Sequence, residues 1–201
     1  MQADNTFNQA ADTFSGLVSQ IPDDVLRQPG LGEWDVRSLI GHTARAVITV
    51  ETYLDRPADT LSVVSAAHYY ALAATQVTDP AAVTERGHQA GQALGDAPGR
   101  LVAELVARVE AKLHRFDQGY QLTTIAGGML LGEYLRTRTF ELVVHSLDIA
   151  TATGLRVDFP PNVLADALLL AGEIAVEHAE ASTVLLALTG RGRLPDGFSL
   201  V

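Results

Sequence analysis

The sequence predicts an all-α protein, a bundle of four main helices with short additional helices. Three observations predict it. Apolar residues recur at helical spacing along most of the chain, Pro and Gly residues gather between those segments, and only QLTTIAGGMLL, at residues 121–131, resembles β-structure. Because the 201 residues show no linker and no internal repeat, we expect a single domain spanning residues 1–201.

The first two helices are marked by residues at their ends. An apolar pattern at helical spacing near the N-terminus stops at Pro22, which cannot continue a helix. Further on, Asp35 occupies the position of an N-cap, and Trp34 and Leu39 flank it at the spacing of a hydrophobic staple. This pattern predicts a second helix over residues 36–54.

The remaining elements follow from the same periodicity. A glycine- and proline-containing stretch, GDAPG at residues 95–99, is expected to break the longest helical pattern. The β-branched and glycine-rich residues 121–131 predict a short hairpin or an extended connector. Helical segments are expected at residues 61–73, 80–116, 131–152 and 161–188.

Composition excludes several classes of function. The formal net charge of −10 argues against a nucleic-acid-binding surface, which needs clustered Lys and Arg. The absence of cysteine excludes a disulfide framework, a thiolate metal site and a Cys nucleophile. Because the N-terminus lacks the features of a signal peptide and no apolar run is long enough to span a membrane, we expect a cytoplasmic protein that does not bind membranes.

A narrow line of polar residues marks the helix expected over residues 131–152. At 3.6 residues per turn, one sector of that helix carries Tyr134, Arg138, Glu141, His145 and Asp148. Apolar side chains lie on both sides of this line, whereas an ordinary solvated face is broad. A polar line of this kind is costly to bury unless its members pair with one another, with another helix or with a metal ion.

Glu141 and His145 have the spacing of paired metal ligands on one helix. A catalytic metal needs a third protein ligand, and His42 is the strongest candidate because it lies beside the apolar arc of the second helix. Other interpretations remain open. A Glu–His pair alone is more often a surface contact, His42 alone is more often a satisfied bundle histidine, and Arg138 is equally well explained as neutralising Glu141.

Two motifs together carry a resemblance to a known family. The segments WDVRSLIGH, at residues 34–42, and RTFELVVHSLDIA, at residues 138–150, resemble the mycothiol-dependent maleylpyruvate isomerase family of the DinB-like superfamily of metal-binding four-helix bundles. The ending LTGRGRLPDGFS also resembles actinobacterial members. The resemblance implies that His42, Glu141 and His145 bind a divalent ion, zinc or nickel being expected. Asp148 matches the Asp that the family usually has one turn after the second His, where it would support a ligand or pair helices. Arg138 and Tyr134, on the same polar line, are candidates for orienting a substrate or cofactor, and a purely stabilising role explains each of them equally well.

The resemblance implies an enzyme in which the metal activates a cofactor thiol or water towards a small electrophile. The expected activity is that of a mycothiol-dependent S-transferase or isomerase, and the absence of cysteine suits a thiol supplied by the cofactor mycothiol. The isomerase itself carries a further C-terminal domain that helps to build its substrate site, and we do not expect such a domain within these 201 residues. The alternative is a non-catalytic bundle that binds a metal or a small ligand. The sequence leaves open whether the chain forms a homodimer.

Overall fold

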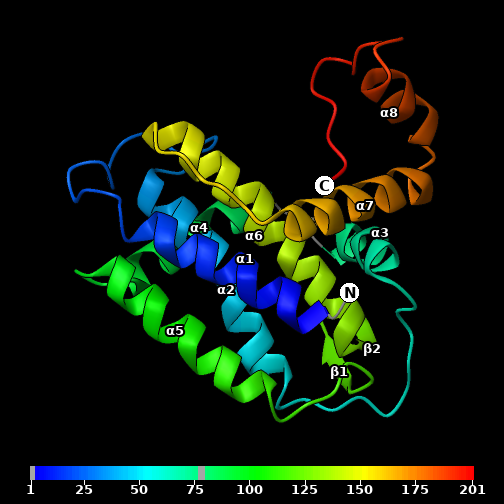
Figure 1. Cartoon of the computed structure of the whole chain (residues 1–201), viewed down its shortest axis with the longest axis horizontal. Coiled ribbons are helices and arrows are strands. Elements are labelled where there is room, and N and C mark those ends of the chain that lie inside the picture. Colours follow the sequence, from blue (N-terminus) through cyan, green and yellow to red (C-terminus); the bar gives the residue numbers. More distant parts are fainter. Residues whose placement is uncertain (1–2, 77–79) are drawn as a thin grey trace.

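The computed structural model describes residues 3–76 and 80–201, and it is mainly helical (Figure 1). The helices are α1 (Ala3–Val18), α2 (Val36–Tyr53), α3 (Ala66–Gln76), α4 (Pro80–Ala93), α5 (Pro98–Leu113), α6 (Leu131–Thr153), α7 (Pro161–Glu177) and α8 (Ala181–Leu188). One antiparallel hairpin joins β1 (Gln121–Thr124) to β2 (Gly127–Leu130). The prediction of an all-α fold with a small β element is therefore confirmed.

Four helices form the central bundle, in which α1 packs against α5 and α6, and α2 packs against the same two helices. Their apolar faces supply a core that includes the fully buried side chains of Phe7, Phe14, Leu39, Leu135 and Leu142. Among the described residues, no helix is long and apolar enough to cross a membrane.

The start of α2 confirms the predicted N-cap. The side chain of Asp35 accepts a hydrogen bond from the backbone nitrogen of Ser38 at 2.8 Å, which satisfies one of the free donors at the helix N-terminus. Along the same helix, α4 approaches very closely at Gly41. A Cβ atom at that position would lie 2.3 Å from the backbone nitrogen of Gly91, so only glycine allows this contact.

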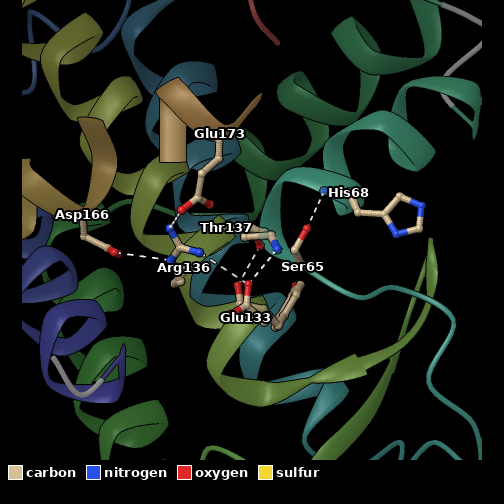
Figure 2. A network of polar contacts seen from close by, with 9 residues as sticks. Ser65, His68, Glu133, Arg136, Thr137, Asp166 and Glu173 are labelled. Carbon is tan, nitrogen blue, oxygen red and sulfur yellow. Dashed lines mark hydrogen bonds and ion pairs between the residues drawn. The ribbon is translucent and has the colours of Figure 1, made fainter. Parts of the chain in front are cut away.

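An ion-pair network holds α7 and α3 against α6 (Figure 2). Arg136 on α6 contacts Asp166 at 3.4 Å and Glu173 at 3.0 Å, both on α7. It also contacts Glu133 at 3.5 Å, and the carboxylate of Glu133 accepts a hydrogen bond from the backbone nitrogen of Ala66 at the start of α3. Arg136 therefore joins α7 to α6, and through Glu133 the same network reaches the start of α3.

Two expected helices differ from the structure. The segment 61–73 becomes helical only at Ala66, because Ser62 and Val63 donate backbone hydrogen bonds to Gly128 of the hairpin instead. The helix expected over residues 161–188 is divided into α7 and α8. Ala179 has a φ of 62°, in the left-handed region that ends helices, and its sequence neighbourhood contains no glycine or proline that would indicate this break.

Candidate metal centre

The polar line on α6 borders a cavity of about 420 Å³. Helix α2 lies opposite α6, and residues of α3, α4 and the hairpin turn line the rest of the cavity. Tyr134, Arg138, Glu141 and His145 from the line all reach the cavity. The polar line is therefore neither solvated nor sealed in the core, because it borders an internal space that a ligand can enter.

His42, Glu141 and His145 come together at this cavity. One donor atom from each side chain lies within 4.8 Å of the donor atoms of the other two. Glu141 and His145 are neighbours on α6, and His42 reaches them from α2, with its ring centre 4.9 Å from that of His145. The structure thus brings together the three side chains that the sequence singled out.

The two oxygens of Glu141 have different partners. Tyr70 on α3 donates its hydroxyl to Oε1 at 2.8 Å, and Oε2 lies 3.3 Å from Nε2 of His145. Burial disfavours the charged carboxylate, but the hydrogen bond from His145 and the positive charge of Arg138 outweigh burial and lower the pKa of Glu141 to about 2. Glu141 is therefore an anion at neutral pH, and its oxygen Oε2 faces the two histidines.

His145 lies between two carboxylates. Its Nδ1 is 3.1 Å from Oδ2 of Asp148, and its Nε2 faces Glu141. Burial opposes a charge on the ring, but hydrogen bonds to Asp148 and Glu141 outweigh it and raise the pKa of His145 to about 9. Asp148 also orients the ring, because a partner on Nδ1 leaves Nε2 as the nitrogen that can bind a cation.

His42 carries the opposite shift. Burial, followed by the nearby charge of His145, lowers the pKa of His42 to about 4. At neutral pH the cluster therefore holds a neutral His42, an anionic Glu141 and a protonated His145. In this arrangement, the proton on His145 supplies the positive charge that a metal ion bound by the same three side chains would supply.

The other predicted residues divide into two groups. Tyr134 and Arg138 border the cavity, and Arg138 forms no ion pair with Glu141 among the described residues. The guanidinium of Arg138 instead lies over the rings of Tyr69 and Tyr134. Asp148 contacts His145 from the next turn of α6.

Two residues near the cluster were not expected from the sequence. Tyr70 belongs to an apolar run with no spacing that relates it to Glu141, so only the folded chain reveals their contact. Trp34 was interpreted as a hydrophobic staple, yet its ring centre lies 4.5 Å from that of His42. The indole nitrogen of Trp34 donates to the carbonyl of Thr84 on α4 at 3.0 Å, which holds the ring beside the histidine.

Comparison with known proteins gives one family. Residues 7–150 match the model of the mycothiol maleylpyruvate isomerase N-terminal domain. Comparisons with curated proteins and with solved structures give no match. The matched segment contains both motifs identified in the sequence and covers well over half of the chain. This chain therefore belongs to the family of the mycothiol maleylpyruvate isomerase N-terminal domain.

Proposed function

We propose that this chain is a divalent-metal-dependent enzyme that acts on a small electrophilic molecule. The observation that carries the proposal is the convergence of His42, Glu141 and His145 from two helices at the wall of a cavity. Three donors of this kind are the usual protein share of a catalytic metal site, in which a position remains for an exogenous ligand. The cavity beside them provides space for that ligand.

The chemistry of the donors fits zinc or nickel. Two imidazole nitrogens and one carboxylate oxygen are suitable ligands for these ions. Asp148 holds the ring of His145, and Tyr70 holds the second oxygen of Glu141. Contacts of this type fix the orientation of metal ligands and are part of most functional sites.

When bound, a divalent ion at these donors would lower the pKa of a thiol or a water molecule in the cavity. The chain contains no cysteine, so the thiol of such a reaction must come from a small cofactor. Membership of the family favours mycothiol in this role. Glu141 is not available as a general base in this scheme, because coordination and the hydroxyl of Tyr70 occupy its oxygens.

The first experiment measures metal content. After dialysis against a chelator and reloading with zinc or nickel, the wild-type protein is expected to hold about one ion per chain. His42→Ala and His145→Ala should lose most of it, whereas His114→Ala should match the wild type because His114 is exposed at the end of α5. Unchanged metal content in both cluster variants would refute the assignment of the ligands.

The second experiment tests catalysis. Metal-loaded protein is incubated with mycothiol and a panel of electrophiles that includes maleylpyruvate, and conjugation or isomerisation is followed by mass spectrometry. Turnover that requires mycothiol and disappears in His42→Ala is expected. A protein that binds the metal but turns over nothing with mycothiol, another thiol or water would instead be a metal- or ligand-binding bundle.

A further inference from the structure

We propose that the cavity binds the carboxylate group of a small organic acid at Arg138, beside the His42–Glu141–His145 cluster. The apolar part of the acid would lie against the aromatic wall of the cavity. This inference adds a substrate class to the function proposed above, and it rests on that function only in calling the bound acid a substrate.

Arg138 is a cation with unused hydrogen-bonding capacity. Its Nε donates to the hydroxyl of Thr137 at 3.0 Å. Among the described residues, its two terminal nitrogens have neither a hydrogen bond nor a carboxylate partner. The carboxylate of Glu141 is close enough for the two charges to attract each other, but it forms no ion pair with the guanidinium, and a direct anionic partner would stabilise the buried cation further. Its neighbour Arg136, by contrast, contacts three carboxylates outside the cavity.

The guanidinium of Arg138 is held in place by aromatic rings. Its Cζ atom lies 5.4 Å from the ring centre of Tyr69 and 5.1 Å from that of Tyr134. Cation–π contacts stabilise the charge without using the N–H donors. The terminal nitrogens therefore remain a rigid pair of donors at the cavity, which is the geometry that binds a planar carboxylate through two parallel hydrogen bonds.

Tyr134 supports Arg138 with its ring, while its hydroxyl is closed off from the cavity. Burial is the largest influence and raises the pKa of Tyr134, so the hydroxyl keeps its proton. A hydrogen bond with Thr49 acts on the same pKa in the opposite direction. The Thr49 hydroxyl donates to the carbonyl of Arg45 at 2.8 Å and keeps lone pairs that can accept from Tyr134. The donors that a ligand in the cavity can reach are therefore those of Arg138.

The charges around the cavity also favour an anion. Although the chain has a net charge of −10, the described residues that line the cavity include three arginines, Arg45, Arg86 and Arg138, and a single acidic side chain, Glu141. Positive side chains around a concave site attract anions towards it. The local charge is thus the reverse of the charge of the whole molecule.

The remaining wall specifies the rest of the ligand. Tyr53, Tyr69, Val83 and Ile125 give the cavity an aromatic and aliphatic lining. At about 420 Å³ the cavity lies within the usual range for small-molecule sites. A small acid with an apolar or aromatic body fits this combination better than inorganic phosphate, which has no apolar part and is not planar.

Benzoate is a direct probe of this site, with benzamide as its neutral counterpart. Calorimetric titration of the zinc-loaded protein should detect benzoate binding and much weaker benzamide binding. Arg138→Gln should weaken benzoate binding by about tenfold to a hundredfold, the usual value of hydrogen bonds to a charged group. Arg115→Gln removes an equal charge from an exposed position far from the cavity lining and should leave the affinity unchanged.

A further variant allows a test even if Arg138→Gln does not fold. Arg138→Lys keeps the charge and removes the paired donors, so benzoate binding should weaken while zinc content stays at the wild-type value. Wild-type benzoate affinity in Arg138→Lys, or tighter binding of inorganic phosphate than of benzoate, would overturn the inference.

Zinc content is measured on every sample, which separates this inference from the proposed function. Benzoate binding that depends on Arg138 in a wild-type protein that holds no metal would support the anion site and refute the metal site. A protein that holds zinc and binds benzoate equally well with Gln at position 138 would refute the anion site and leave the metal proposal intact. Benzoate that binds only through the zinc ion belongs to this second outcome.

Discussion

Metal binding at this cluster should release one proton at neutral pH, and the proton should come from His145. A ring with a pKa of about 9 is protonated at pH 7, whereas a metal ligand must be neutral. The pKa of His145 lies about two units above pH 7, so protonation weakens the apparent metal affinity at pH 7 by about a hundredfold, or about 2.7 kcal/mol. His42, with a pKa of about 4, is already neutral and releases nothing.

The sign of the pH dependence follows directly. The apparent affinity for the metal should rise about tenfold for each unit of pH between about 5 and 8. It should level off above about pH 9, because His145 then carries no proton for the metal to displace. In the metal-free protein the same proton stabilises the fold. Its contribution should be complete below pH 6.5 and lost as the pH rises through about 9.

Calorimetric titration of zinc into the metal-free protein, in buffers of different ionisation enthalpy, counts the protons released. About one proton per ion is expected at pH 7. Asp148→Asn removes a carboxylate that raises the pKa of His145, so in this variant the metal affinity should level off at a lower pH than in the wild type. If the wild type releases no proton, or if the metal affinity of Asp148→Asn levels off at the same pH as that of the wild type, the assigned charges are wrong.

Three further predictions concern the supporting structure. Tyr70→Phe removes the hydroxyl that holds the ligand carboxylate, so metal affinity measured against a competing chelator should fall about tenfold to a hundredfold. Arg136→Met should lower the free energy of unfolding by about 2 kcal/mol, because it leaves three partly buried carboxylates without their ion-pair partner. Arg100→Met, which breaks an exposed pair, should change that free energy by at most about 0.5 kcal/mol. Gly41→Ala should lower the free energy of unfolding by about 3 kcal/mol, because the new Cβ would meet the backbone of α4. Gly16→Ala, on an open helix surface, should raise it by about 0.5 kcal/mol. Urea unfolding measures both changes.

Periodicity and capping residues predicted most of the architecture, because these signals are local. The N-cap at Asp35, the break before α5 and the hairpin before α6 all depend on neighbouring residues in the chain. The division between α7 and α8 was missed because it depends on Ala179, an unusual residue at a left-handed position. Local patterns do not specify such a conformation.

The same distinction applies to the site. The line from Tyr134 to Asp148 follows from helical geometry, so the sequence predicted that these side chains share a face. The contact of Tyr70 with Glu141 joins residues 71 positions apart and has no periodic signal. The free terminal nitrogens of Arg138 were also beyond the sequence, since only the folded structure shows that Arg138 and Glu141 form no ion pair.

The two arginines of α6 also set the angular alignment of the helix. Residues two positions apart point in directions about 200° apart around the axis, so Arg136 faces outwards to α7 while Arg138 faces the cavity. A turn of 20° about that axis would move side-chain tips by about 2 Å, enough to spoil a precisely placed reactive group. Arg136 pairs with two carboxylates on α7 and with one on α6 itself. It therefore fixes the rotation of α6, and the direction in which Glu141 and His145 point depends on a contact on the opposite side of their helix.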